Sequence, residues 1–227
     1  MIDIHSHVLP EMDDGSRGVE ESLAMLRTSA EQGISVVAAT PHFYPEQNDP
    51  KKFLHRRALS VKQLREVWEE GLPKLLLGAE VAYFEGISHV EKIKDLCLEE
   101  TNLLLLEMPF SPWTERMAKE VRMLGEHYGI RVVLAHTERY RCYKKAPVWD
   151  ELLANEVLVQ CNAEFFSNRW TRRQARYMLE KGEIQLLGSD CHNMRNRRPN
   201  MRKALQVIGE SGCRMIEQNC RELGIIL

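Results

Sequence analysis

Short apolar runs alternate along the chain with amphipathic segments of helical spacing. The apolar runs are nearly continuous, which is typical of strands covered on both faces of a parallel sheet. They predict seven strands, at residues 2–4, 34–40, 74–79, 103–106, 131–135, 157–160 and 184–188. The intervening segments predict helices at residues 19–32, 49–70, 111–127, 148–154 and 168–182, an amphipathic stretch at 88–99, and two helical segments near the C-terminal end.

Seven strand–helix units indicate an α/β fold in which right-handed crossovers place the helices outside a parallel sheet. No repeat, low-complexity tract or linker interrupts the pattern. We therefore expect one domain over residues 1–227, folded as a distorted (β/α)7 barrel of the TIM type. In such barrels the active site lies at the carboxyl ends of the strands.

Side chains that can bind metal ions follow six of the seven predicted strands. With 33 Asp and Glu and 8 His among 227 residues, about one residue in six is of these types. Chance is not expected to place them at six strand ends, and only the sixth strand departs from the pattern, ending near Asn162. The candidate ligands are His5, His7, Asp14, His42, Glu80, Glu107, His136, Asp190 and His192.

The first strand delivers a pair of histidines, His5 and His7. Because side chains on a strand repeat every two residues, both imidazoles project from the same face and form half of a metal site. An acidic turn closed by Gly15 follows. Asp14 is expected to add an oxygen ligand, whereas Asp13 is interpreted as a turn residue.

Nine candidate ligands exceed the roughly three or four protein groups of a single zinc site. They predict two or three divalent metal ions with bridging carboxylates, about 3.5–4 Å apart. Imidazole and carboxylate donors without thiolate favour manganese, iron or zinc. Such a site activates water as hydroxide at neutral pH, and its attack on phosphorus would hydrolyse a phosphoester.

Two arginines in loops at the same end of the barrel are candidates for binding the phosphate. Arg139 follows His136 and Arg197 follows His192, and their forked donors suit a phosphoryl group. Arg195 and Arg198 are close enough in sequence to replace Arg197.

Several motifs together resemble those of a known family. They are IDIHSH at the start of the chain, MDDGS, TPH at 40–42, GAE at 78–80, LLLLEMP at 103–109, LAHTERY at 134–140 and SDCHN at 189–193. From residue 1 to about residue 203 the chain resembles the PHP (polymerase and histidinol phosphatase) family. It is most similar to the bacterial metal-dependent tyrosine-protein phosphatases of capsular and exopolysaccharide operons.

The resemblance implies a single metallophosphatase domain of the PHP fold with a trinuclear site usually served by manganese. It also implies a substrate, the phosphotyrosine-bearing tail of a polysaccharide-synthesis tyrosine kinase. The family's ligands match all nine residues above, and its catalytic arginines match Arg139 and Arg197. A phenol leaves with a pKa of about 10 and so needs little acid catalysis; either His42 or Asp14 is expected to donate the proton.

Other functions share parts of this pattern. Cys191 and Arg197 have the C-x5-R spacing of cysteine-dependent tyrosine phosphatases. That mechanism needs a thiolate in a loop of backbone N–H donors, usually one with glycines, and no glycine lies between these two residues. A cysteine mechanism is therefore disfavoured. A histidinol-phosphate phosphatase or another small-molecule phosphomonoesterase is the main alternative. An amidohydrolase usually has a bridging lysine where Glu107 stands, and a non-catalytic metal- or phosphopeptide-binding protein would not need the complete ligand set.

Charge and composition indicate the charge of the substrate and the cellular location of the protein. Residues 131–203 hold 15 Lys and Arg against 8 Asp and Glu, although the whole chain has a net charge of −2; this region suits an anionic substrate. No apolar run approaches the roughly 20 residues of a membrane span, and the early His5 leaves no room for a signal peptide. Six cysteines without a C-x-x-C pair favour reduced thiols and a cytoplasmic location. No nucleic-acid partner and no membrane insertion are expected.

Overall fold

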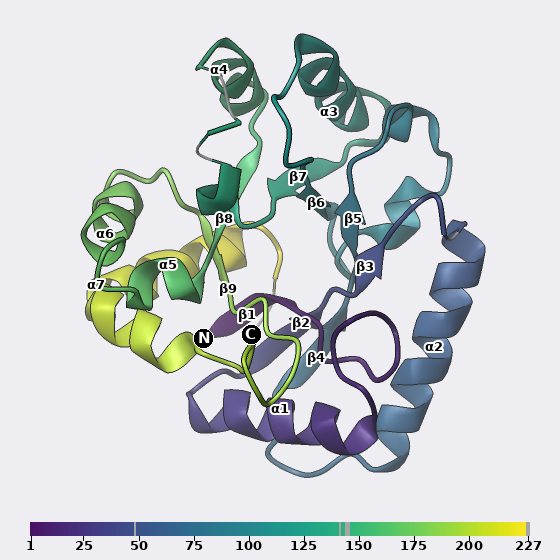
Figure 1. Ribbon diagram of the computed structural model, residues 1–227, viewed down its shortest axis with the longest axis vertical. Helices are drawn as coiled ribbons and strands as arrows, with labels where there is room; N and C mark the ends of the chain where they lie inside the picture. Colours follow the sequence, from purple (N-terminus) through teal and green to yellow (C-terminus); the bar gives the residue numbers. More distant parts are fainter. Residues whose placement is uncertain (48, 141, 144–145, 226–227) are drawn as a thin grey trace.

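A parallel sheet curls into a barrel at the centre of the molecule (Figure 1). The computed structural model describes residues 1–47, 49–140, 142–143 and 146–225. Two runs of paired strands, in the order β1-β2-β4 and β3-β5-β6-β7-β8-β9, make up the sheet. The strands are β1 (Ile2–Ser6), β2 (Val36–Ala39), β3 (His42–Phe43), β4 (Lys74–Leu77), β5 (Glu80–Ala82), β6 (Leu103–Glu107), β7 (Arg131–Leu134), β8 (Leu158–Asn162) and β9 (Leu186–Gly188).

All seven predicted strands are present, and the second and third are each followed by a further short strand, β3 or β5, that was not predicted. Thr40 and Pro41 separate β2 from β3, and Gly78 and Ala79 separate β4 from β5. Pro41 has no N–H to donate to a ladder, and both its carbonyl and that of Thr40 accept from the N–H of Glu80. The break lets β3 pair with β5, which places His42 directly opposite Glu80.

The barrel closes where β9 meets β1. The N–H of Asp190 donates to His5 O (2.8 Å) and the N–H of His7 donates to Cys191 O (2.9 Å). Gly188 permits this approach, since a Cβ there would lie 2.5 Å from the Cβ of His5. The closure confirms the predicted distorted barrel and brings the first and last strand ends together.

Helices surround the ring of strands (Figure 1). The structure has α1 (Val19–Glu31), α2 (Pro50–Glu66), α3 (Glu115–Tyr128), α4 (Ala146–Ala154), α5 (Ala163–Ser167), α6 (Arg172–Glu180) and α7 (Met201–Glu222), with 3₁₀ turns η1 (Ile87–His89), η2 (Ile93–Leu96) and η3 (Thr137–Tyr140). Gly209, at φ 66°, kinks α7 into two parts, as the two predicted C-terminal segments require. No helix among the described residues is long and apolar enough to cross a membrane.

Several predicted boundaries differ from the structure; α2, for example, ends at Glu66 rather than at residue 70. The stretch 88–99 forms two 3₁₀ turns because Val90 adopts an extended backbone between them. Helix α3 starts after Thr114, whose side chain accepts from the N–H of Met117, rather than at residue 111. Helix α6 starts after Thr171; Asn168 instead accepts the N–H of Trp170 with its side chain.

Candidate metal centre

All nine candidate ligands lie at the carboxyl ends of the strands, where the barrel brings them together. His5 is in β1, His42 begins β3, Glu80 begins β5 and Glu107 ends β6. The others lie in the loops that follow β1, β7 and β9. Six of the nine side chains are buried, whereas those of His42, Glu107 and Asp14 are 12%, 17% and 66% exposed. The site is therefore open to solvent on the side where Asp14 lies.

Donor atoms of these residues converge in three groups. The groups are His7, Asp14, His42 and His192; His5, His7 and Asp190; and His42, Glu80 and Glu107, with the donor atoms in each group within 4.8 Å of one another. His136 adjoins the third group, since its Nε2 lies 2.9 Å from Glu80 Oε1 and 3.4 Å from Glu107 Oε1. Every predicted ligand is thus in or beside a group that could hold an ion.

Glu80 occupies the centre of the site. Its Oε2 lies 3.2 Å from His5 Nε2, 3.3 Å from His7 Nε2 and 3.0 Å from His42 Nδ1. Burial raises the pKa of this carboxyl, but the surrounding histidines outweigh burial and hold its pKa well below the usual range. Glu80 is therefore a carboxylate that faces imidazole nitrogens from β1, from the loop after β1 and from β3.

The hydrogen-bonding state of the site fits divalent metal ions. His42 Nδ1, Glu80 Oε2 and His192 Nε2 are buried without a hydrogen-bond partner, even though the first two atoms are 3.0 Å apart. Buried polar atoms without partners are rare and call for an explanation such as an ion. Burial, His7 and Arg197 also lower the pKa of His192 to about 4.

Asp13 orients a histidine and is more than a turn residue. Its Oδ2 lies 2.7 Å from His7 Nδ1 and accepts the N–H of His42 at 2.8 Å, while its Oδ1 accepts the N–H of Gly15. Burial lowers the pKa of His7, but the carboxylates of Asp13 and Glu80 raise it to about 10. A carboxylate on the outer nitrogen of a metal-binding histidine fixes its ring and its tautomer.

Two amides from β8 support the opposite side of the site. Gln160 Oε1 lies 3.2 Å from His5 Nδ1 and accepts the N–H of His136. Its Nε2 donates to Asn162 Oδ1, and Asn162 Nδ2 donates to Asp190 Oδ2. The sixth predicted strand lacked a ligand because it supplies these amides instead. The only sequence signal was two polar residues at alternate positions of an apolar strand, which point to the same face.

Two site residues adopt the left-handed backbone region that disfavours side chains. His136 has φ 33° and Asp190 has φ 53°. Such strained conformations persist only when the surrounding structure holds them, and they cluster at functional sites.

Both predicted arginines contact Asp190. Arg139 Nη2 donates to Asp190 Oδ2 at 2.6 Å, and Arg197 Nη2 donates to Asp190 Oδ1 at 2.8 Å. Burial raises the pKa of Asp190, but His5, His7 and Arg139 hold it well below the usual range. Arg195 and Arg198 are exposed, so Arg197 is the one of the three that contacts the site in this structure.

Aromatic rings flank the opening. Phe110, 52% exposed, lies nearly parallel to the His136 ring, with centroids 6.3 Å apart, and 5.1 Å from the ring of Tyr140. Tyr44 stacks on His42 at 5.0 Å. Phe110 and Tyr44 were not identified from the sequence, because an aromatic residue in a loop gives no signal without its neighbours.

A family model for capsular polysaccharide synthesis, CpsB/CapC, matches residues 1–222. The chain belongs to this family. This confirms the resemblance that the motifs indicated.

The chain is also similar to proteins named as tyrosine-protein phosphatases. The chain is 29% identical over 231 residues to the tyrosine-protein phosphatase CpsB of Streptococcus pneumoniae, covering 92% of this chain and 90% of that protein. It is 30% identical over 216 residues to the tyrosine-protein phosphatase YwqE of Bacillus subtilis, covering 92% and 84%.

The fold also matches a solved structure. A chain from the crystal structures of YwqE from Bacillus subtilis and CpsB from Streptococcus pneumoniae superposes with a TM-score of 0.82 at 23% identity, covering 100% of this chain and 96% of that one. Those proteins are described as unique metal-dependent tyrosine phosphatases. The superposition extends the likeness of fold to the whole length of this CpsB/CapC chain.

Cysteine-based catalysis does not fit this CpsB/CapC chain. Cys191 is only 1% exposed, and burial raises the pKa of its thiol well above the usual range. A nucleophilic cysteine needs the thiolate and access to substrate. The C-x5-R spacing is therefore coincidental.

Proposed function

We propose that this chain is a metal-dependent protein-tyrosine phosphatase that acts on the phosphotyrosine-bearing tail of a tyrosine kinase of capsule or exopolysaccharide synthesis. The observation that carries the proposal is the convergence of imidazole and carboxylate donors in three groups beside two arginines that share one carboxylate. The activity of its curated relatives supports the same reaction. Residues 1–227 would act as one catalytic domain, and six free cysteines support a cytoplasmic location.

The nine residues would hold two or three divalent ions. Manganese is the metal we propose, with iron and zinc as alternatives that the same donors suit. His7 and His42 each belong to two of the three groups, so each could bind either of two neighbouring ions. When bound, such ions supply a water of lowered pKa and stabilise charge on phosphoryl oxygens.

Arg139 and Arg197 would hold the phosphate. Asp190 fixes each guanidinium through one nitrogen, and the remaining N–H groups can donate to phosphoryl oxygens. Both side chains are about one-third exposed, at 36% and 37%, so substrate can reach them. Their charge is most useful as negative charge spreads over the oxygens in the transition state.

The leaving oxygen would receive a proton from His42 or Asp14. The carboxylate of Asp14 is the most exposed of the candidate ligands and lies 3.6 Å from His42 Nε2. A phenol with a pKa of about 10 leaves far more readily than an alkyl alcohol, so this proton transfer contributes less than it would for phosphoserine.

The position of Phe110 favours a substrate with an aromatic ring. Its half-exposed ring lies beside His136 at the opening of the site, where the ring of phosphotyrosine could pack against it. Offset or edge-to-face aromatic pairs are worth about 0.5–1.5 kcal/mol beyond their buried area. Phosphoserine and histidinol phosphate offer no such phenyl ring.

Turnover of three substrates tests the function. With manganese added, a phosphotyrosine peptide should be hydrolysed with a higher kcat/KM than a phosphoserine peptide or histidinol phosphate. A preference for histidinol phosphate would replace the proposed function by that of a small-molecule phosphomonoesterase. Removing metal with a chelator and restoring manganese, iron or zinc separately would identify the active ion, and activity that survives chelation would contradict the metal mechanism.

A further inference from the structure

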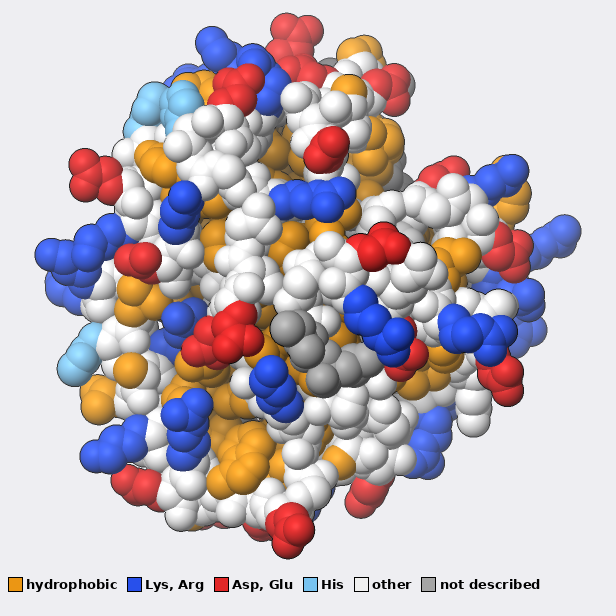
Figure 2. Space-filling view, turned by 180° about the vertical axis from the view of Figure 1, so that it is seen from behind, with side chains coloured by type: hydrophobic (Ala, Val, Ile, Leu, Met, Phe, Trp, Pro, Cys, Tyr) orange, Lys and Arg blue, Asp and Glu red, His pale blue; other side chains and the backbone are white. Residues whose placement is uncertain are grey.

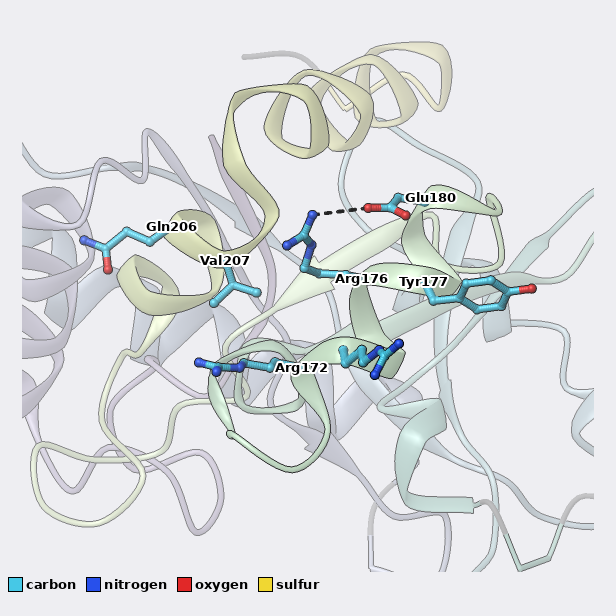
Figure 3. A pocket seen from close by; sticks show the side chains of 7 residues that line it. Arg172, Arg176, Tyr177, Glu180, Gln206 and Val207 are labelled. Carbon is cyan, nitrogen blue, oxygen red and sulfur yellow. Dashed lines mark hydrogen bonds and ion pairs between the residues drawn. The ribbon is translucent and has the colours of Figure 1, made fainter.

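A cavity of about 550 Å³ lies between α6 and α7, and none of the proposed metal ligands lines it. Arg172, Arg173, Arg176 and Tyr177 line it from α6, and Val207 lines it from α7 (Figure 3). Its volume is within the range of small-ligand sites, about 300–1,000 Å³. We call this feature the arginine cleft.

Positive charge in the arginine cleft is largely uncompensated. Arg176 pairs with Glu180 at 3.4 Å, whereas within the described ranges Arg172 and Arg173 form no ion pair. Residues 168–182 carry five Arg and Lys and one Glu, although the whole chain has a net charge of −2. Lys and Arg side chains are visible along the right-hand edge of Figure 2, the side on which α6 lies in that view. A local excess of this kind attracts anionic ligands.

Helix stability does not account for this arrangement. Arg172 and Arg173 are the first two residues of α6, and its first turn holds no acidic residue. The helix dipole disfavours cations at this end. Arg172 and Arg176, four residues apart, also repel each other along the helix. The placement therefore costs stability and is better explained by binding.

Exposed aromatic rings accompany these arginines. Trp170, directly before α6, is 78% exposed, and the guanidinium of Arg169 lies 4.2 Å from the centre of its ring. Tyr177 on the wall of the cleft is 57% exposed. Guanidinium groups beside aromatic faces offer a phosphate site and a ring-packing site together.

Both helices that line the arginine cleft follow, along the chain, segments that carry residues of the candidate metal centre. The segment α5–α6 follows β8 directly, starting after Asn162, whose amide donates to Asp190. Helix α7 follows the loop that carries His192 and Arg197. Because helices in such a barrel run back from the carboxyl ends of the strands, the first turns of α6 and α7 lie toward the end that holds the metal centre.

From these observations, and resting on the proposed phosphatase function, we propose that the arginine cleft binds a second phosphotyrosine of the same substrate chain while the first occupies the metal centre. Arg172 and Arg173 supply positive charge that attracts the phosphate dianion, and Tyr177 packs against the phenyl ring. The arginine cleft would raise affinity for multiply phosphorylated tails without taking part in hydrolysis.

Kinetics on paired peptides test this inference. The two peptides of a pair share one phosphotyrosine and differ at a second position, which holds phosphotyrosine in one peptide and tyrosine in the other. The two positions are separated by about 4 to 12 residues, which span ~13–40 Å when extended. Wild-type protein should show a lower KM for the doubly phosphorylated peptide at some spacings. R172E/R173E should lose this advantage, so that its KM for the doubly phosphorylated peptide rises by about tenfold, the effect of one lost charge-assisted contact. Its kcat and its hydrolysis of p-nitrophenyl phosphate should not change. R172K/R173K should retain part of it.

A matched control separates local binding from overall charge. Lys62 and Arg65 are exposed on α2, which lies at the opposite edge of the molecule from α6 (Figure 1). K62E/R65E changes the net charge equally and should keep the advantage of the doubly phosphorylated peptide. Equal losses in both double variants would mean general electrostatic attraction and would overturn the inference.

Binding without turnover distinguishes this inference from the proposed function. Fluorescence anisotropy would use the doubly modified peptide with a non-hydrolysable phosphonate in place of each phosphate. Weaker binding by R172E/R173E but not by K62E/R65E supports the arginine cleft even if wild-type protein hydrolyses neither peptide, a result that would reject the proposed function alone. Unchanged peptide binding by R172E/R173E overturns the inference. Binding of the same proteins to vesicles of anionic lipid is measured alongside. A loss confined to the vesicles would make the arginine cleft a membrane contact and would also overturn the inference.

Discussion

Asp13 Oδ2 lies 2.7 Å from Nδ1 of His7 and also accepts the backbone N–H of His42. One carboxylate thus fixes the ring of one proposed ligand and the backbone position of another. The neighbouring Asp14 points instead toward His42 Nε2 and His192 Nε2, at 3.6 and 3.4 Å. Two adjacent aspartates therefore have different parts in the site, one orienting a ligand and the other offering an oxygen as a ligand.

Replacing Asp13 by asparagine should weaken metal binding. The amide cannot supply the negative charge that holds His7 Nδ1–H, and loss of such a partner typically costs about 10–100-fold in metal affinity. Manganese titration followed by elemental analysis measures the effect. Asp150, exposed on α4, offers the control D150N, which should bind metal like the wild type. A D13N protein with unchanged affinity and unchanged activity would leave Asp13 as a turn residue.

Substituting Arg139 by lysine should reduce turnover while leaving the metal bound. Lysine keeps the charge but not the planar fork that suits a phosphoryl group, so we expect kcat to fall by about 100-fold or more. Metal content should stay at the wild-type level because Arg139 contacts Asp190 from outside the three donor groups. R195K is the control, since Arg195 is exposed. Loss of metal together with activity would assign Arg139 a structural role.

Thiol reagents should not inhibit the enzyme. Iodoacetamide is expected to label exposed Cys142 but not buried Cys191, whose protonated thiol is unreactive. Mass spectrometry of the labelled protein identifies the modified residue, and an activity assay accompanies it. The variant C191A should hydrolyse the phosphotyrosine peptide with wild-type kcat. Inactivation that tracks modification of Cys191 would revive the cysteine mechanism.

Shortening Phe110 to alanine should act on aromatic substrates selectively. Loss of the ring is expected to raise KM for phosphotyrosine peptides by about two- to tenfold, in line with the energy of an aromatic pair. The KM for an alkyl phosphate should not change, and F110W should restore binding of the aryl substrate. An equal effect on both substrates would indicate that Phe110 only supports His136 and Tyr140.

Strand positions and strand-end chemistry were predictable from local patterns. Continuous apolar runs such as residues 103–106 have one stable environment, the interior of a covered sheet. Parallel strands bring their carboxyl ends to one edge, so the nine candidate ligands could be grouped before their contacts were known. The α3 stop at Gly129, which has φ 65°, follows from the same kind of local rule.

Helix starts and strand breaks were less predictable, because neighbouring elements decide them. Pro41 separates β2 from β3, but the pairing of His42 with Glu80 also depends on the matching break between β4 and β5. Thr114 caps α3 although residues 111–112 carried an equally good local signal. Local propensity is weak at such boundaries, and packing selects among competing caps.

The sequence by itself determined which residues could bind metal and at which end of the barrel they lie, because strand period and parallel pairing are local and repetitive properties. Only the tertiary structure decided their partners: Asp13 with His7, Gln160 with His5, and Arg197 rather than Arg195 or Arg198 with Asp190. These contacts join residues whose distance and direction depend on barrel closure. The closure rests on the approach of β9 to β1 at Gly188, which no local pattern specifies.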